Sequence, residues 1–530
     1  MFWLPFFVIV PVMLAVFLYV FFTIKFARVL AVIAQSAFLA PTFLLLLATR
    51  YEEIADTVGG YYGVLGITLR ADNLSAVFIF LTVIIFLAAG IYTINTPYDR
   101  TKRLYLFLIF LLQGAMIGLF LSRDFFNVFV LVEVSTVVVT LLLMYDPKRR
   151  NLFAGMTFLM TNIIVMQFYL FGLGYLYMLT GVLDMEVAAQ RIAQLDTRTI
   201  ALPYALIMTS IASKCSLLPM LTWLPKINAL SSARFTVAAI ISGIHIKSGI
   251  YLFIRFQDVF GGLGTEFFLI IGIITAVAGV VMALAQSDIR LLLAYSTIAQ
   301  VGLIIAGLSI GNFYSHIGAL FHIVNHAVFK VALFLCAGQI SYALQTTDLR
   351  KMRGALRNEP IIAWANVLAV LGIIGAPLFG GSVSKHFVMY GATGALEWVF
   401  MLINLGTMLV FVKYSAIFFG EPMGEVRVVK HDKFRLAVVL GLGAACFALG
   451  LFGGGVVTFL FNVPVIVSGY LEKLAIFAAS LGVAIIVYRK VLHPRAFLAR
   501  LDGFSLSFHK ICVSVGAFFA VLLVYVGVVA

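Results

Sequence analysis

Long apolar runs recur along this chain, separated by short polar junctions. Most of these runs are 20 residues or longer, enough for a helix to cross a hydrocarbon core of about 30 Å. They lack the alternation of polar and apolar positions that a membrane β-barrel requires, so the backbone has to satisfy its hydrogen bonds within helices. The pattern predicts an all-α polytopic membrane protein. Sixteen spans are expected, at about residues 2–23, 28–49, 73–97, 104–122, 124–145, 151–180, 201–222, 232–256, 264–286, 291–309, 313–343, 361–391, 398–420, 436–454, 466–488 and 509–529.

Two of the junctions are longer than a turn. Residues 50–72 contain a Gly-Gly pair and a Tyr/Val/Ile/Thr-rich run, which predicts an external hairpin-like loop. Residues 183–200 place Met185, Ala188, Ala189, Ile192 and Leu195 at helical spacing between polar residues, which favours an interfacial helix. The last two spans follow a glycine run at 453–455, and we expect them to be an addition to a fourteen-helix body.

Composition agrees with this pattern. The 530 residues are 63% hydrophobic and 11% charged, with a mean hydropathy of +1.11, which excludes a set of soluble domains. The first apolar run has no basic leader and no small-residue cleavage site, so it is predicted to be a retained helix rather than a signal peptide.

The net charge of +14 is explained by topology without invoking nucleic acid. When the spans are threaded alternately, 24 of the 36 Lys and Arg residues fall on one side, 7 fall on the other, and 5 lie inside spans. Basic loops stay cytoplasmic, so both termini are predicted to lie outside a cell membrane.

No motif for a cofactor or a nucleotide is present. Cys215, Cys336, Cys446 and Cys512 are far apart, and each lies in an apolar run, which favours buried hydrophobic side chains over metal or iron–sulfur ligands. Rossmann, P-loop and EF-hand patterns are absent from the sequence. We therefore predict no cofactor, no metal and no ATP-driven pump in this chain.

Six ionisable residues lie inside predicted spans. They are Glu133, Lys214, Lys247, Lys330, Lys385 and Lys413. Each costs roughly 2.5–3.5 kcal/mol on insertion scales, so the default interpretation is an ion pathway that faces the bundle interior. Lys413 is the exception, because it lies near the cytoplasmic end of its span and can extend its ammonium group to the interface.

Two of the lysines lie beside predicted helix breaks. Lys214 precedes Pro219 and Pro225, and Pro219 cannot donate a hydrogen bond to the carbonyl of Cys215. Lys385 follows a second disrupted stretch, which contains Gly375, Pro377, Gly380 and Gly381. Two interrupted spans, each with a Ser-Lys pair, are typical of transporters with inverted repeats. The break follows the lysine in the first case and precedes it in the second.

A third group of residues lies on one helix face. His322, His326 and Lys330 are spaced i, i+4 and i+8, and histidine titrates near neutral pH, so this face could pass protons. A metal site at the two histidines is disfavoured, because no HExxH pattern and no nearby third ligand accompany them. His245 and His386 stand beside Lys247 and Lys385 and could either pack or relay protons. Lys247 itself lies between small residues that would let a neighbouring helix approach closely.

These segments, in this order, resemble the antiporter-like subunit family shared by complex I, Mrp-type Na⁺/H⁺ antiporters and membrane-bound hydrogenases. The resemblance covers about residues 60–420 and rests on DFFNVFVLVEVS, KCSLLPMLTWLP, SGIHIKSGIYLF, SDIRLLLAYSTIAQVGLI, LFHIVNHAVFKVALFLCAG and GAPLFGGSVSK. The DFFN…E form is similar to Mrp D-type and hydrogenase-type subunits. Arg290, Ala376-Pro377 and Leu221 depart from the usual Lys, Pro-Pro and His of this family.

The resemblance implies a fourteen-helix core with two inverted five-helix repeats, broken helices seven and twelve, and about two extra C-terminal helices. It implies four parts: an N-terminal part at 1–103, the repeats at 104–256 and 257–420, and C-terminal helices at 421–530. By resemblance, Glu133, Lys214, Lys247, His322, His326, Lys330 and Lys385 form a proton-translocating axis that transmits charge changes to neighbouring subunits.

Three functions remain open at this point. The first is proton translocation, alone or in exchange for Na⁺, by an antiporter-like subunit within a larger membrane complex. The second is a scaffold that docks partner subunits without its own transport. The third is the proton module of an inorganic-carbon or solute transporter. No catalytic redox site is encoded, so energy has to come from an ion gradient or from partner subunits.

Overall fold

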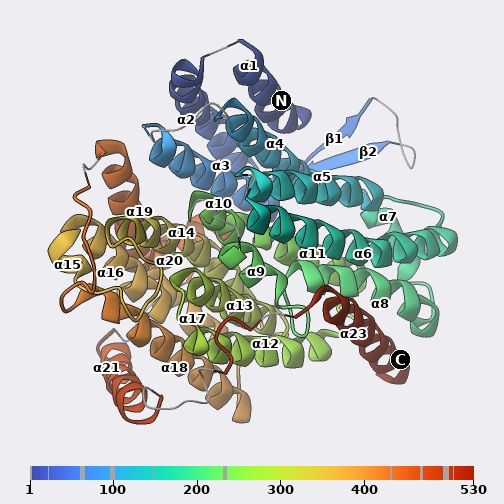
Figure 1. The fold of residues 1–530 in the computed structure, drawn as a ribbon. Helices are drawn as coiled ribbons and strands as arrows, with labels where there is room; N and C mark the ends of the chain where they lie inside the picture. The colour runs from blue at the N-terminus through green and yellow to red at the C-terminus, as the bar shows by residue number, and fades with distance from the viewer. Residues whose placement is uncertain are drawn as a thin grey trace.

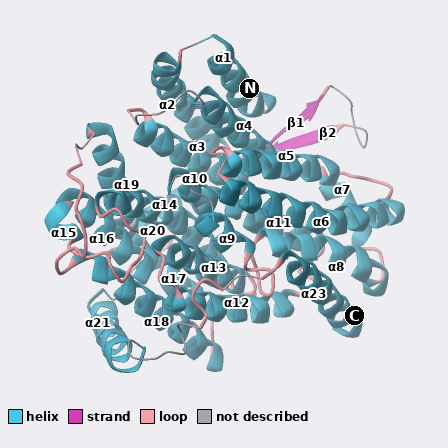
Figure 2. Cartoon of the chain, viewed as in Figure 1, coloured by secondary structure: helices cyan, strands magenta, loops and turns pink. Residues whose placement is uncertain are grey.

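The chain forms a bundle of helices with one small β-hairpin at its edge (Figures 1 and 2). This computed structural model describes residues 3–21, 23–59, 66–95, 102–146, 148–230, 235–429, 432–465, 470–492, 500–504 and 506–529. Thirteen helices in these ranges are long and apolar enough to cross a membrane, and α1 and α16 are shorter apolar helices. The prediction of an all-α polytopic membrane protein is confirmed.

The N-terminal third contains six long helices. They are α1 (Pro5–Phe21), α2 (Ile24–Ala48), α3 (Asn73–Thr93), α4 (Lys102–Leu121), α5 (Phe125–Met144) and α6 (Arg149–Thr180). Between α2 and α3, strand β1 (Ile54–Val58) pairs antiparallel with β2 (Ile67–Ala71), which confirms the hairpin predicted within 50–72.

The middle of the chain contains the first broken span. Its elements are α7 (Met185–Ile192), α8 (Thr197–Lys214), α9 (Trp223–Leu230), α10 (Phe235–Ile240), the π-helical turn η2 (Ile241–His245), α11 (Ile246–Val259) and α12 (Thr265–Ala285). The helix predicted within 183–200 is present as α7, with Met185, Ala188 and Ile192 buried. It is shorter than predicted, because Asp196 accepts a hydrogen bond from the Arg198 amide (2.8 Å) and thereby begins α8.

The next part contains the second broken span. Its elements are α13 (Ile289–Leu308), α14 (Phe313–Ala343), α15 (Ala355–Asn358), α16 (Pro360–Ile374), α17 (Gly380–Tyr390), α18 (Ala395–Ser415) and the 3₁₀ turn η3 (Ala416–Phe418). Most of the central helix α14 is buried, with Phe313, Tyr314 and Tyr342 exposed near its ends, so it forms the core of this half of the molecule.

The C-terminal part wraps around the bundle. It contains α19 (Lys433–Leu451), α20 (Gly453–Phe461), α21 (Tyr470–Val487), the π-helical turn η4 (Tyr488–Leu492) and α23 (Phe508–Val529). The glycine run 453–455 ends α19 as expected, but it also begins the short helix α20. In Figure 1, α21 lies at the lower left beside α18, and α23 lies at the lower right, where it packs against α8 and α6.

A short segment before α23 is fixed to the turn between α12 and α13. The buried side chain of Gln286 donates to the Leu501 carbonyl (3.1 Å) and accepts from the Gly503 amide (3.0 Å), and the Ser287 amide donates to Asp502 (3.0 Å). Tyr295 donates to the Phe504 carbonyl (3.0 Å). Residues 501–504, a few positions before the last helix, are thus fixed to the bundle by these hydrogen bonds.

One backbone pairing occurs twice in the molecule. Asp124 pairs with Asp184 before α5, and Asp288 pairs with Asp348 before α13. Asp288 and Asp348 each lie 164 residues after their counterparts. The amide-to-carbonyl distances are 2.9 Å (Phe125 to Leu183), 2.8 Å (Met185 to Arg123), 2.9 Å (Ile289 to Thr347) and 2.8 Å (Leu349 to Ser287). Both Asp124 and Asp288 also cap the helix that follows.

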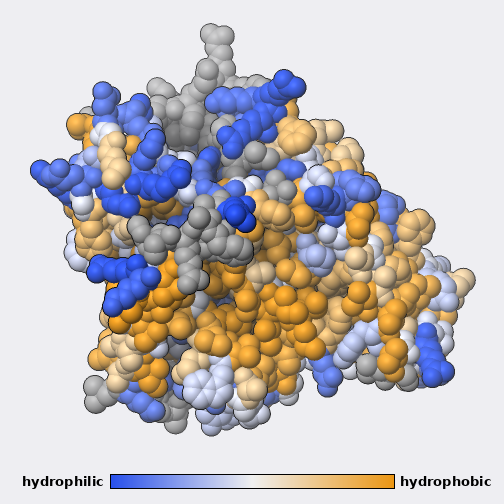
Figure 3. Space-filling model, turned by 60° about the horizontal axis from the view of Figure 1, so that its bottom comes forward, coloured by the Kyte–Doolittle hydropathy of each residue, from blue (hydrophilic) through white to orange (hydrophobic). Residues whose placement is uncertain are grey.

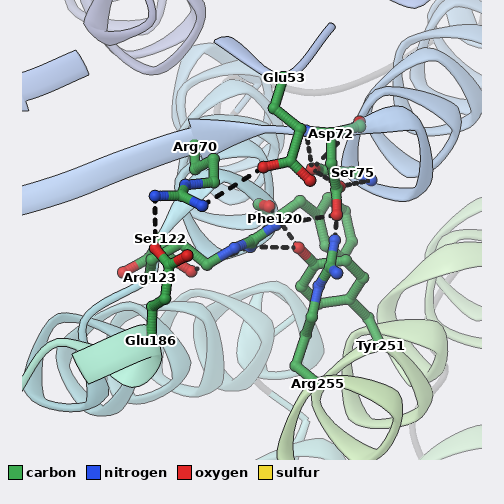
Figure 4. Close-up of polar contacts among 10 residues, drawn as sticks. All are labelled: Glu53, Arg70, Asp72, Ser75, Phe120, Ser122, Arg123, Glu186, Tyr251 and Arg255. Atoms are coloured by element: carbon green, nitrogen blue, oxygen red, sulfur yellow. Dashed lines mark hydrogen bonds and ion pairs between the residues drawn. The ribbon is translucent and has the colours of Figure 1, made fainter. Parts of the chain in front are cut away.

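A cluster of ion pairs joins the hairpin to the helix ends around it (Figure 4). Asp72 accepts a hydrogen bond from the Ser75 amide at the start of α3 (2.9 Å) and pairs with Arg255 of α11 (2.5 Å) and Arg123 (3.2 Å). Arg123 also donates to the Tyr251 hydroxyl (2.9 Å). Burial alone would raise the pKa of Asp72, but the charges of Arg255 and Arg123 outweigh it and hold that pKa well below its usual range.

The same cluster extends along the hairpin. Arg70 on β2 pairs with Glu53 (3.3 Å) and with Glu186 of α7 (2.5 Å). We call Glu53, Arg70, Asp72, Arg123, Glu186 and Arg255 the hairpin cluster. It places the hairpin, the α4–α5 turn, α7 and the end of α11 on one face of the bundle.

The surface is that of a membrane protein. Figure 3 shows hydrophobic residues in a broad band on one side of the molecule, with hydrophilic residues gathered along its upper edge. Large apolar side chains are exposed on α5, including Phe126, Val137 and Leu141, and on α6, including Phe153 and Phe171. Such exposure suits a hydrocarbon environment or a neighbouring subunit rather than water.

Candidate ion pathway

The first part of the candidate pathway joins α5, α6 and α8. Lys214, the last residue of α8, is buried, and its ammonium group donates to the Thr136 hydroxyl (2.9 Å) and to the Asn162 side-chain oxygen (2.8 Å). Glu133 lies three residues before Thr136 on α5, and its charge interacts with that of Lys214. Among the described residues, Glu133 forms no ion pair within 4.0 Å. One of its buried carboxylate oxygens has no hydrogen-bond partner in the described chain.

The chain leaves the helical conformation directly after Lys214. Helix α8 ends at Lys214, and α9 does not begin until Trp223. Two groups bind the backbone freed by the break: the Trp223 indole donates to the Ser213 carbonyl (2.9 Å), and the Leu218 amide donates to the Thr275 hydroxyl (3.0 Å). Pro219 lies in the break. Pro225, predicted to be part of it, lies in the first turn of α9, where a missing N–H costs no helical hydrogen bond.

Helix α11 passes directly beside this break. A Cβ atom added to Gly249 would come within 3.1 Å of the Lys214 and Cys215 backbone, so glycine is what lets the two elements meet. Lys247, two residues earlier, is fully buried and donates to the Ser242 carbonyl (2.8 Å) in the π-helical turn. His245 is buried in the same turn, and its charge would interact with that of Lys214. The π-helical turn was not expected from the sequence.

The predicted face of α14 is buried at the centre of the bundle. The His322 ring bonds to the Ser384 hydroxyl of α17 (2.9 Å) and to the Gln300 side chain of α13 (3.0 Å). Lys330 donates to the Leu293 carbonyl (3.0 Å) and to the Ser296 hydroxyl of α13. His326 lies between them and is fully buried. Neither of its ring nitrogens bonds to a described residue.

The second break precedes Lys385, as predicted. Helix α16 ends at Ile374, and its C-cap Gly375 has a positive φ of 79°, a backbone conformation that favours glycine. Pro377 lies in the break. The Lys385 ammonium group on α17 donates back to the Ile373 carbonyl (2.7 Å) and across to the Asn404 side chain on α18 (2.9 Å).

Two glycines predicted to form this break instead begin the next helix. Gly380 and Gly381 lie in the first turn of α17. A Cβ atom at Gly380 would collide with the Asn325 side chain, and one at Gly381 would collide with the Gly372 carbonyl oxygen. Their small size therefore allows α17 to approach α14 and α16 closely.

Two candidate residues lie apart from the buried set. His386 is exposed on α17, where its ring packs against Phe387 and Tyr390, so the structure does not bring it together with the buried residues. Lys413 donates to the Leu284 and Gln286 carbonyls at the end of α12 (2.7 and 2.6 Å). It caps that helix, which agrees with the structural role expected of it.

The remaining groups form a series of two electrostatically linked sets, which meet at His245 and Lys247, two residues apart in the chain. Electrostatic interactions link Glu133 to Lys214, Lys214 to His245, Lys247 to Lys330 and His326, and His322 to Lys385. The series crosses α5, α8, α11, α14 and α17. Four uncharged partners were not identified from the sequence: Thr136, Asn162, Gln300 and Asn404. Their only sequence signal is a polar residue within an apolar span.

Three comparisons agree with the motif-based resemblance. A family described as "NADH:quinone oxidoreductase/Mrp antiporter, TM" matches residues 122–410. The N-type subunit of NADH-quinone oxidoreductase from Desulforudis audaxviator is 31% identical over 487 residues, 87% of this chain and 95% of that protein. The D-type subunit of the Na⁺/H⁺ antiporter from Alkalihalophilus pseudofirmus is 28% identical over 411 residues, 73% of this chain and 82% of that protein.

The fold is also found in a solved structure. A chain in the Mrp complex from Dietzia superposes with a TM-score of 0.78 at 22% identity, covering 94% of this chain and 99% of that one. Both Mrp and complex I subunits are among the relatives, so similarity to the D-type branch in particular stays a prediction. The family match covers more than half of the chain, and the chain therefore belongs to the NADH:quinone oxidoreductase/Mrp antiporter family of membrane subunits.

Proposed function

We propose that this chain translocates protons, alone or in exchange for Na⁺, as the antiporter-like subunit of a multisubunit membrane complex. The observation that carries the proposal is a set of buried lysines and histidines, with the half-buried Glu133 at one end and Lys385 at the other. These groups lie on α5, α8, η2, α11, α14 and α17. Buried ionisable groups in membrane spans are costly and mark ion pathways. That the chain is one subunit of a larger complex is inferred from its relatives. They are named as subunits of a Na⁺/H⁺ antiporter and of an NADH-quinone oxidoreductase.

The proposed roles follow from the contacts. Glu133 and Lys214 form the acid–base pair at one end, and Lys385 forms the other end. Lys247, His326 and Lys330 lie between them, and His322 connects this centre to the Ser384-Lys385 pair. His245 extends the pair Glu133–Lys214 towards Lys247. A change of charge on one group alters the protonation of the next, because two unit charges about 8 Å apart at an effective dielectric near 20 interact by roughly 2 kcal/mol.

The layout of two inverted repeats is part of the proposal. It is supported by the duplicated pairing at Asp124–Asp184 and Asp288–Asp348, by the similar lengths of α6 and α14 (32 and 31 residues), and by one broken span in each half. The repeats would lie within 104–256 and 257–420. The surplus of basic residues on one face supports a cell-membrane location with both termini outside.

The test is a transport assay with the complex in proteoliposomes. Glu133→Gln and Lys214→Met should each abolish formation or dissipation of a proton gradient, while the subunit still assembles. Glu397→Gln and Lys351→Met remove the same groups from exposed positions and should leave transport unchanged. Normal transport in both pathway variants would overturn the proposal and favour a scaffold.

A second measurement defines the energy source. Copurification of redox subunits with this chain would identify a redox-driven pump. A complex without them that exchanges Na⁺ for H⁺ would identify a stand-alone antiporter.

A further inference from the structure

A cavity lies between α16, α18 and α21, away from the proposed pathway. Its volume is about 540 Å³, within the range of roughly 300–1,000 Å³ that ligand pockets occupy. Its wall is mostly apolar. The apolar side chains include Val370 and Ile374 of α16, Met408 and Phe411 of α18, and Leu481 and Ile485 of α21.

The position of α21 explains the cavity. This helix packs against α18, and only 6% of its apolar span is buried. It therefore lies at the periphery of the bundle (Figure 1). Protein interiors are close-packed, and apolar walls without neighbours lose dispersion contacts. In a bilayer, the available material of matching polarity is the acyl chain of a lipid.

The lining residues run from the basic face of the molecule to the second helix break. One end lies at Arg353 and Arg489, in polar segments on the basic face of the molecule. The other end lies at Ile374, where α16 stops at the second helix break. A span interrupted near its middle covers about half of a hydrocarbon core of roughly 30 Å. The cavity therefore accommodates a chain from the leaflet on the basic side.

The rim carries positive charge without a compensating acid. Arg353 is held in place by the Leu349 and Met352 carbonyls (both 2.6 Å), and Arg489 is exposed on η4. Among the described residues, no carboxylate lies within 4.0 Å of either guanidinium. The neighbouring acids Asp348 and Glu421 pair with Arg350 and Arg357 instead.

We propose that this cavity binds an anionic glycerophospholipid, with an acyl chain between α16, α18 and α21 and the phosphate between Arg353 and Arg489. Basic pockets between membrane helices are suited to anionic head groups, and arginine binds phosphate oxygens in a two-pronged geometry. This binding site is independent of the proposed proton pathway. The bound lipid fills the gap that otherwise separates α21 from α16.

Native mass spectrometry of the full chain in detergent tests the proposal. Dioleoyl-phosphatidylglycerol and dioleoyl-phosphatidylcholine are titrated separately. The anionic lipid should bind more tightly, and Arg353→Gln with Arg489→Gln should weaken its binding roughly tenfold or more. Arg353→Lys with Arg489→Lys should retain much of the preference. Lys148→Gln with Arg149→Gln removes two charges from the same face elsewhere and should change nothing.

A second variant tests the cavity itself. Leu481→Trp, on the marginal helix α21, should fill the cavity and reduce binding of both lipids, with size-exclusion chromatography as the check that the chain remains folded. Equal binding of the two lipids by the native chain would overturn the anionic specificity. Unchanged phosphatidylglycerol binding by folded Leu481→Trp, or a photocrosslinker at Ile485 that captures a protein helix in the complex rather than lipid, would overturn the site.

Discussion

The four buried lysines of the pathway are solvated by neutral oxygen atoms. Each ammonium group donates to a backbone carbonyl, a hydroxyl or an amide oxygen, and Glu133 is the one acid that interacts with any of them among the described residues. The lysines are Lys214, Lys247, Lys330 and Lys385. Removing one partner of a buried ion pair leaves an uncompensated charge. A lysine whose hydrogen-bond acceptors are neutral can release its proton without leaving a carboxylate as an uncompensated buried charge. This property suits proton transfer.

Thr136→Val tests this arrangement at one residue. The change removes one of the two oxygens that bind the Lys214 ammonium group and keeps the shape of the side chain. Hydrogen bonds to charged groups contribute roughly 1.5–3 kcal/mol, so we expect the unfolding free energy to fall by about that amount and proton transport to fall about tenfold. Thermal unfolding in detergent and the proteoliposome assay measure the two effects.

The matched control is Thr157→Val on α6. Among the described residues, the Thr157 hydroxyl donates to the Phe153 carbonyl of its own helix turn and to no other group. Its loss should change stability by less than about 0.5 kcal/mol and leave transport intact. Equal effects of the two substitutions would show that Thr136 does not act through Lys214.

How far the sequence predicts the pathway depends on the type of residue. Lysine and glutamate stand out in apolar spans because their insertion cost is high, and each of those predicted to be deep is buried or half-buried. Thr136 and Asn162 do not stand out, because uncharged polar residues are common in membrane helices and often bond to their own backbone. For His386 the sequence left packing and proton relay open: one residue from Lys385, it points to another side of the same helix, where its ring packs against Phe387 and Tyr390.

At the scale of elements, the two breaks place a lysine in different ways. In the first, Lys214 ends α8, and in the second, Lys385 follows the start of α17 by one turn and reaches back to the Ile373 carbonyl. Proline and glycine in the sequence predict that a span is interrupted. They do not predict which residues begin the next helix, because that depends on the helices that pack around the break.

Gly381→Ala tests the close packing at the second break. The added methyl group would overlap the Gly372 carbonyl oxygen, a backbone atom that cannot move aside alone. Overpacking of this kind costs about 1–3 kcal/mol, so we expect a lower melting temperature and impaired transport. Gly441→Ala on α19 is the control, because nothing lies within 4 Å of its added Cβ atom. A melting temperature for Gly381→Ala equal to that of the control would contradict the close approach.

The hairpin cluster predicts a pH dependence of stability. The pKa of Asp72 is lowered in the folded chain, so its stabilising effect is present above the ordinary pKa of about 3.9 and is lost as the pH falls further. Asp72→Asn removes the carboxylate that pairs with both Arg123 and Arg255 and should destabilise the protein by about 3 kcal/mol or more at pH 7. The difference in melting temperature from the native chain should shrink below about pH 4.

The control for this prediction is Asp146→Asn. Asp146 pairs with Lys148 at an exposed junction (3.1 Å), and such pairs contribute about 0–1 kcal/mol. Its effect on the melting temperature should be small at every pH. A pH-independent loss of stability in Asp72→Asn would mean that Asp72 acts through helix capping at α3 rather than through its charge.

At the scale of the whole molecule, contacts sort the junctions into two faces. The hairpin cluster brings together junctions from 53–72, 123, 186 and 255. On the other face, the α12–α13 turn contacts 347–349 and 501–503, and the Arg427 amide bonds to the Ala343 carbonyl (2.8 Å). When the predicted spans are threaded alternately through the membrane, the same junctions are expected together on each side. The charge surplus then predicts that the second face is cytoplasmic.

Accessibility of single cysteines tests this topology. In a chain carrying Cys512→Ser, the remaining cysteines Cys215, Cys336 and Cys446 are buried. Gln190→Cys, exposed on α7, should react with a membrane-impermeant thiol reagent added outside intact cells, because α7 lies on the hairpin face. Lys351→Cys, exposed after α14, should react only after permeabilisation. The reverse pattern would invert the orientation that the positive charges predict, and labelling of both positions from outside would contradict alternate threading and the inverted repeats that depend on it.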